Sequence, residues 1–104
     1  MFSNTTFTFA NYTVKLARGF YGNGNKALQL LDAEDGSPVL IATTNLGFRN
    51  PPNLITIKNW SENEGVLDFL LDIGFIDSVD HYEQAGFAVA HVCRLSAEGK
   101  KFFE

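Results

Sequence analysis

Seven carboxylates lie in one stretch of the chain that contains no lysine or arginine. The stretch is bounded by Lys58 and Arg94, and its acids are Glu62, Glu64, Asp68, Asp72, Asp77, Asp80 and Glu83. The whole chain has twelve acidic and eight basic residues, which gives a formal net charge of -4. One segment is therefore strongly acidic while the remainder is mildly basic, and this asymmetry bears on which surfaces the protein meets.

The spacing of Glu64, Asp68 and Asp72 predicts that these acids line one face of a helix. Like charges at this spacing repel by roughly 0.2–0.5 kcal/mol per pair, so local stability does not explain the pattern. One interpretation is a binding surface, in which the seven acids contact a basic partner. The other is a solvated face of a mildly acidic protein. Its charges would then pair with Lys15, Lys58 or Arg94.

No group of residues has the spacing of a catalytic or metal site. His81, His91 and Cys93 are the only histidines and cysteine, whereas a structural zinc site uses four such ligands. Cys93 has no partner for a disulfide within the chain, and its apolar neighbours favour a small core residue. We predict no enzymatic activity, no cofactor and no metal. Direct binding of nucleic acid is not expected either, because the pI is about 5.0 and basic residues cluster only at Lys100-Lys101.

A possible small-molecule pocket involves the loop from Gly47 to Asn53, where paired prolines prevent regular structure. Phe48 and Arg49 are its candidate lining residues. Trp60 is a third candidate, since tryptophan is enriched among binding hot spots, although it also fits packing over the start of a helix.

Most of the chain carries the alternation of half-buried strands. Glycine and asparagine between Gly22 and Asn25, and Asp35-Gly36, predict tight turns between the first three strands. A bulge or turn is expected near Asn11. The expected strands are Thr6 to Leu16, Ala27 to Leu31, Val39 to Thr44, Leu54 to Lys58, Phe75 to Tyr82 and Phe87 to Leu95.

One principal helix should begin at Glu62, because Ser61 and Glu64 have the spacing of a capping box. Its apolar residues follow the helical period, and Gly74 stands where a left-handed cap is expected. Residues Ala97 to Phe103 form a short terminal helix or a frayed tail. The fold class is α+β: an antiparallel β-sheet of about five to six strands packed against one principal α-helix, in a single domain spanning residues 1–104.

The bulk composition indicates a soluble, folded protein. Apolar residues make up 45% of the chain, but no run approaches the roughly 20 that a membrane-spanning helix needs. The N-terminal residues do not have the basic and apolar regions of a secretory signal. We therefore expect a cytoplasmic protein that does not bind membranes.

The block from Ile57 to Gly65, with its Ser-Glu-Asn-Glu-Gly sequence, is the most specific part of a wider resemblance. Together with Asn23 to Leu30, Asp35 to Pro38 and Thr43 to Leu46, it resembles a family of small uncharacterised proteins carried by bacteria, phages and mobile elements. The resemblance runs from about Tyr21 to Leu95. It implies no catalytic residues. It does imply a genomic setting in which small acidic proteins act as stoichiometric inhibitors of host defence, including anti-CRISPR proteins.

The leading hypothesis is a stoichiometric inhibitor whose acidic surface engages a basic host protein or nucleoprotein complex, such as a CRISPR effector. One alternative is a small-molecule or nucleotide binder. Another is an assembly subunit that forms a homodimer through the strand edge from Thr6 to Leu16. The sequence leaves the oligomeric state open between monomer and homodimer.

Overall fold

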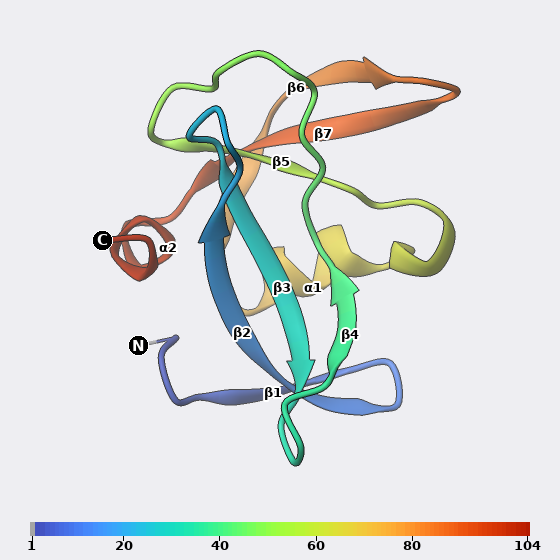
Figure 1. Cartoon of the computed structure of the whole chain (residues 1–104), viewed down its shortest axis with the longest axis vertical. Coiled ribbons are helices and arrows are strands. Elements are labelled where there is room, and N and C mark those ends of the chain that lie inside the picture. The colour runs from blue at the N-terminus through green and yellow to red at the C-terminus, as the bar shows by residue number, and fades with distance from the viewer. Residues whose placement is uncertain (1) are drawn as a thin grey trace.

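The first half of the chain folds into a four-stranded antiparallel sheet (Figure 1). The computed structural model describes residues 2–104. The strands follow one another across the sheet as β1 (Thr6–Phe9), β2 (Tyr12–Phe20), β3 (Lys26–Asp32) and β4 (Pro38–Ile41). Gly24 and Gly36 have positive φ in the two turns that flank β3, a conformation that glycine adopts without steric cost. Both predicted turns are confirmed.

The strand predicted from Thr6 to Leu16 is instead a hairpin. Phe9 and Tyr12 are register partners, so the chain reverses at Ala10 and Asn11, and the turn predicted near Asn11 is confirmed. β2 pairs with β1 on one side and with β3 on the other. The open edge on this side of the sheet is therefore only β1, which is much shorter than the edge predicted.

The expectation of one sheet on one principal helix is wrong, although the α+β class is confirmed. A second antiparallel sheet has three strands in the order β5-β7-β6. Its strands are β5 (Leu54–Ile57), β6 (Ile76–Ala85) and β7 (Ala88–Leu95). The turn between β6 and β7 falls at Gly86 and Phe87, so β6 extends beyond Tyr82, where the predicted strand ended.

The two sheets meet where the chain leaves β4. The amide of Lys58 donates to the carbonyl of Ala42 at 2.9 Å, and Thr43 forms an isolated bridge with Ile57. The strand predicted from Val39 to Thr44 is thus divided, because its first part pairs with β3 and its end pairs with β5. Alternation in sequence identifies a strand but not its partners, which is why one sheet was expected where there are two.

Helix α1 (Val66–Asp72) lies behind the four-stranded sheet in the view of Figure 1. It begins at Val66 and not at Glu62, and the predicted capping box is wrong. Ser61 starts the separate 3₁₀ turn η1 (Ser61–Asn63), and Gly65 then takes a φ of 95° that breaks any continuous helix. The N-cap position is Gly65, which has no side chain to accept a hydrogen bond, and Oδ1 of Asn59 instead accepts from the amide of Leu67 in the first turn at 2.9 Å.

The end of α1 agrees with prediction. Gly74 has a φ of 79°, and its amide donates to the carbonyl of Leu71 at 3.1 Å. The amide of Phe75 donates to the carbonyl of Leu70 at 2.9 Å. These two bonds make a Schellman motif, which satisfies carbonyls left open at the helix end. Phe75 and Leu70 are fully buried, so the same turn returns the chain to the core.

The C-terminal residues form helix α2 (Ala97–Phe102) and not a frayed tail. Ser96 caps it by accepting from the amide of Gly99 at 3.0 Å, and its hydroxyl also donates to the carbonyl of Gly74 at 2.6 Å. Phe102 and Phe103 both pack on the ring of Phe75 in the core. Among residues 2–104, no helix has the length and apolar character needed to cross a bilayer.

Candidate functional site

The acids of the lysine- and arginine-free segment lie on several elements and do not form one continuous row. Glu62 lies in η1, Glu64 follows it, Asp68 and Asp72 lie in α1, and Asp77, Asp80 and Glu83 lie in β6. Four of these residues, Glu64, Asp68, Asp72 and Asp77, are exposed, as is Glu62, whereas the side chains of Asp80 and Glu83 are about one third exposed, at 32% and 38%. The structure sorts them into three groups with different surroundings.

Glu64, Asp68 and Asp72 line one shallow depression of about 390 Å³ between α1 and the β1–β2 turn. We call it the acidic depression. Its remaining lining residues are Thr8, Phe9, Ala10, Gly65 and Phe69. No basic residue is among them, so three acidic residues line this depression without a cation in its described lining.

The fold builds the acidic depression from two elements far apart in sequence. Asp68 and Asp72 share a face of α1 because they are four residues apart. The backbone of Glu64 is held just before the helix, where its amide donates a hydrogen bond to the carbonyl of Ser61 at 3.2 Å. Beneath them, the rings of Phe9 and Phe69 make an edge contact with centroids 5.3 Å apart. The site therefore combines an apolar floor with an acidic wall.

Glu62 belongs to a different environment, because it pairs with a cation. Its Oε1 accepts from Nζ of Lys58 at 2.7 Å, an i,i+4 pair. This hydrogen bond, with smaller contributions from the local backbone and from Ser61, lowers the pKa of Glu62 from 4.5 to about 2. The pairing with Lys58 that the sequence left open is thus confirmed for this acid.

Two of the three acids of β6 have polar partners within the molecule. Asp80 accepts from the guanidinium of Arg94 at 2.9 Å and lies 2.7 Å from Nδ1 of His81, while Nε2 of His81 lies 3.3 Å from Glu83. The hydrogen bond from His81, followed by the charge of Arg94, lowers the pKa of Asp80. Asp77 is exposed on the same strand, outside the acidic depression.

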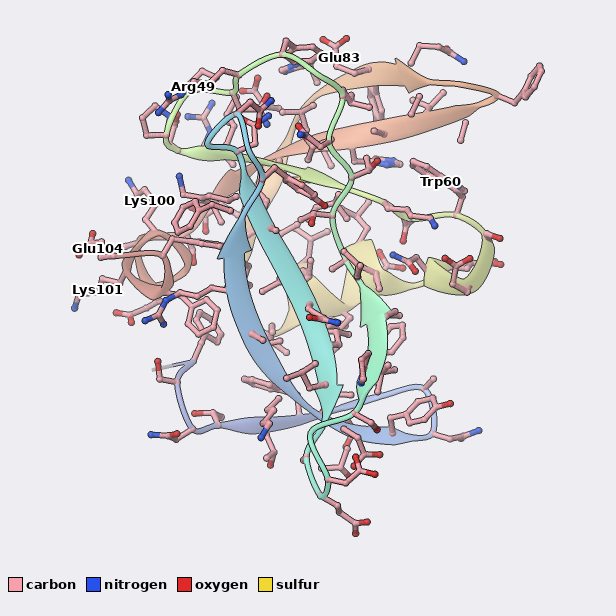
Figure 2. The ribbon with its side chains drawn as sticks, viewed as in Figure 1. Arg49, Trp60, Glu83, Lys100, Lys101 and Glu104 are labelled. Atoms are coloured by element: carbon pink, nitrogen blue, oxygen red, sulfur yellow. The ribbon has the colours of Figure 1, made fainter. Side chains whose placement is uncertain are left out.

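The three residues proposed for a small-molecule pocket are not brought together. Figure 2 shows Arg49 and Trp60 at opposite sides of the view, and the exposed Phe48 does not line the hollow that contains Arg49. That hollow, of about 150 Å³, does lie between the first sheet and the predicted loop. Its lining residues are Phe20, Gly24, Asn25, Lys26, Arg49, Asn50, Pro51, Pro52 and Leu54.

The loop that carries Arg49 is held down by the buried side chain of Asn25. Its Nδ2 donates to the carbonyl of Phe48 at 2.7 Å and to Oδ1 of Asn45 at 3.0 Å, and its Oδ1 accepts from the amide of Asn50 at 2.8 Å. Backbone groups on both sides of Arg49 are therefore fixed. A loop without regular structure is thus anchored at three points by the side chain of Asn25.

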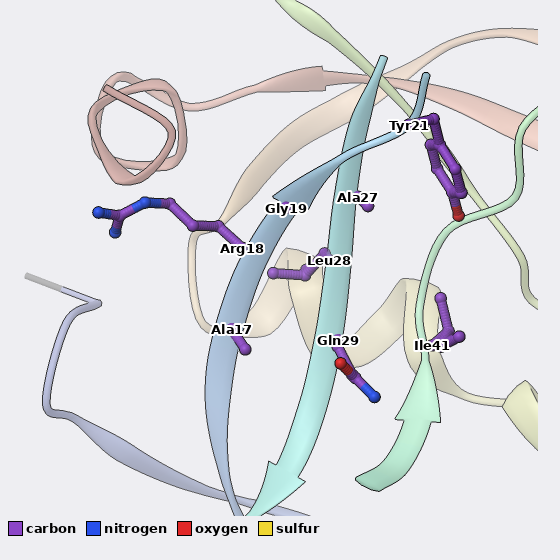
Figure 3. Close-up of a pocket in the computed structure, with 8 residues that line it drawn as sticks. All are labelled: Ala17, Arg18, Gly19, Tyr21, Ala27, Leu28, Gln29 and Ile41. Carbon is purple, nitrogen blue, oxygen red and sulfur yellow. The ribbon is translucent and has the colours of Figure 1, made fainter. Parts of the chain in front are cut away.

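A further hollow of about 150 Å³ lies on the outer face of the first sheet (Figure 3). It exists because small residues, Ala17, Gly19 and Ala27, occupy neighbouring positions on β2 and β3. Figure 3 shows the side chain of Arg18, its one charged lining residue, extending away from the others. The guanidinium of Arg18 lies over the ring of Phe102, with Cζ 5.4 Å from the centroid. Polar groups do not converge on this hollow.

Comparison of the chain with protein-family models, curated proteins and solved structures gave no match. The family resemblance in the sequence therefore stays a prediction, and the residues must carry the functional argument.

The remaining candidates for chemistry take structural positions. Cys93 is fully buried, and burial raises the pKa of its thiol to about 12, which confirms the core interpretation. Within residues 2–104 no group of three or more histidine, cysteine or acidic residues has a geometry that could hold a metal ion. His91 makes an edge contact with the ring of Tyr82, with centroids 5.1 Å apart.

The residue that sequence reasoning missed is Lys26, which shares a hollow with Arg49. The two are distant in sequence, and the hydrogen bond between Asn25 and Asn50 brings their segments together. The sequence does place an asparagine next to each cation, since Asn25 precedes Lys26 and Asn50 follows Arg49. Nothing in their spacing shows that the two asparagines form a hydrogen bond.

Proposed function

We propose that the protein is a non-catalytic binding protein that uses the acidic depression to engage lysine or arginine side chains of a basic partner. The convergence of Glu64, Asp68 and Asp72 on one depression without a described cation in its lining carries this proposal. The partner class is a nucleic-acid-handling protein or nucleoprotein complex of host defence, which the protein inhibits by stoichiometric binding. That class follows from the family resemblance.

The chemistry of the acidic depression matches a long basic side chain. Carboxylates bind guanidinium or ammonium groups through charge-assisted hydrogen bonds. The aliphatic stem of the same side chain would cover the rings of Phe9 and Phe69, as long basic side chains do on apolar surfaces. A single depression thus supplies complementary contacts for both parts of one lysine or arginine.

The other acids contribute less to this proposal. Glu62, Asp80 and Glu83 already have cationic or histidine partners within the chain. A partner protein would have to compete with Lys58, Arg94 or His81 for them. We therefore narrow the predicted seven-acid surface to the three acids of the depression, with Asp77 as an exposed acid outside it.

The test is affinity capture from a bacterial lysate that contains host-defence complexes, at low and high salt. The wild-type protein is compared with a double variant, Asp68→Lys with Asp72→Lys, and with Asp77→Lys as a control that changes an exposed acid of the same segment. Thermal melts verify that each variant folds. Wild type and the control should retain a near-stoichiometric, salt-sensitive partner, which the double variant loses. Equal capture by all three proteins would contradict the proposal.

A further inference from the structure

Two cations meet in the hollow beneath the loop that follows residue 46. Lys26, at the start of β3, and Arg49 both line it, and no acidic residue is among its lining residues. Neither side chain takes part in an ion pair within residues 2–104. Lys26 gives one hydrogen bond to the carbonyl of Pro52 at 2.7 Å, which leaves two of its three donors for other acceptors.

The backbone on both sides of Arg49 is held in place. Asn25 holds the carbonyl before it and the amide after it, at 2.7 and 2.8 Å. The guanidinium of Arg49 lies against Gly24. A Cβ atom at Gly24 would be only 3.3 Å from Cζ of Arg49, so a side chain there would crowd the guanidinium. A planar fork of donors thus lies in the same hollow as Lys26, whose ammonium group is also placed over the ring of Phe103, 5.8 Å from its centroid.

The electrostatics of this pair favour an added anion. Burial, and next the positive charge of Arg49, lower the pKa of Lys26. Each cation raises the free energy of the other, and an anion bound between them would relieve that repulsion. Two cations match the charge of a phosphate monoester, about -1.5 to -2 at neutral pH, better than the single charge of a phosphodiester.

The size of the hollow restricts what enters. At about 150 Å³ it is smaller than the roughly 300–1,000 Å³ of a pocket that encloses a whole drug-sized ligand. A hollow of this volume has room for one phosphate group, and the remainder of the ligand would lie outside it. Phe20 lines the same hollow and is 58% exposed, so its ring offers an apolar surface to that remainder.

We propose that Lys26 and Arg49 form a binding site for the terminal phosphate of a phosphate monoester, with Phe20 contacting the organic part. This site lies on different residues from the acidic depression and does not depend on it.

The test is an amide chemical-shift titration of the protein with AMP, inorganic phosphate and glucose 6-phosphate, each at matched ionic strength against sodium chloride. Adenosine and glucose are the ligands without phosphate. We expect shifts at Gly24, Asn50 and Lys26 with each phosphate compound. Tighter binding of AMP than of inorganic phosphate is expected from contact with Phe20. Arg49→Gln should weaken binding about tenfold or more, because it removes charge-assisted hydrogen bonds.

Lys101→Gln is the matched control, since it removes an exposed cation of α2 that does not line the hollow, and it should bind as wild type does. Arg49→Lys separates charge from geometry and should be intermediate. Equal binding of adenosine and AMP, equal effects of chloride and phosphate, or unchanged binding by Arg49→Gln would overturn the proposal. So would silence with all three phosphate compounds at about 10 mM. The double variant Asp68→Lys with Asp72→Lys should still bind AMP, so this proposal and the proposed function fail separately.

Discussion

Asparagine side chains hold the loops that carry both candidate sites. Asn25 anchors the loop around Arg49, and Asn59 accepts from the amide of Leu67 in the first turn of α1. Asn63 is buried and donates to the carbonyl of Ile41 at 2.6 Å and to the carbonyl of Lys58 at 3.2 Å. Asparagine suits these roles because one short side chain supplies both donors and an acceptor. Its partners here are set by tertiary structure, so the sequence showed turn-forming residues but not which backbone groups they bind.

Replacing Asn25 with alanine should lower the free energy of unfolding by about 1–3 kcal/mol, because it leaves partly buried backbone groups of the loop without the hydrogen bonds of that side chain. Urea denaturation measures this change. Hydrogen exchange at the amide of Asn50, which loses its acceptor, should accelerate more than exchange within β3. The control is Asn11→Ala in the exposed β1–β2 turn, which should change stability little. A normal exchange rate at Asn50 in the Asn25 variant would show that the loop is held by other contacts.

The pair formed by Lys58 and Glu62 predicts a pH dependence with a definite sign. The pKa of Glu62 is lowered to about 2 from 4.5, so its contribution to stability is fully present above about 4.5 and is lost as the pH falls towards 2. In Lys58→Gln the pKa of Glu62 should rise towards 4.5, as followed by NMR titration of the side-chain carboxyl carbon. Lys15→Gln is the control. An unchanged pKa in the Lys58 variant would assign the shift to the backbone instead.

At the scale of elements, local signals were reliable at helix ends marked by glycine and unreliable where two patterns overlapped. Gly74 ends α1 as expected, because glycine readily adopts the left-handed conformation that commonly terminates a helix. The capping box at Ser61 failed because Gly65 adopts a left-handed conformation inside the expected helix. Ser61 has a φ of 59°, so the block predicted to start one helix forms a separate 3₁₀ turn.

Helix α2 should depend on Gly99, because a Cβ atom there would overlap the carbonyl oxygen of Phe75 and approach Leu95. Gly99→Ala should lower the free energy of unfolding by about 1–3 kcal/mol, despite the higher helix propensity of alanine. Chemical denaturation tests this expectation. Gly22→Ala is a matched control, since a Cβ atom there meets nothing within 4 Å and the residue does not have positive φ. Equal stability of the Gly99 variant and wild type would mean that α2 does not pack as described.

At the scale of the whole molecule, charge is more organised than composition alone reveals. Figure 2 shows Arg49, Lys100 and Lys101 on one side of the view, away from Trp60. The sequence predicted an acidic segment and a basic remainder, but it could not show that Asp80 pairs with Arg94 or that His81 contacts both Asp80 and Glu83. The pair of Asp80 with Arg94 joins β6 to β7, and the register shifts between Ile76 and Ser78 and between Val79 and His81 are not visible in the sequence pattern.

The most direct test of the central claim is an amide chemical-shift footprint of the protein with a short oligoarginine peptide at low salt. We predict that the largest changes fall on Glu64 to Asp72 and on Thr8 to Ala10, that they weaken as salt rises, and that they are lost in the variant Asp68→Lys with Asp72→Lys. Changes concentrated at Asp80 and Glu83, or spread evenly over all acids, would contradict the claim that the acidic depression is the binding site.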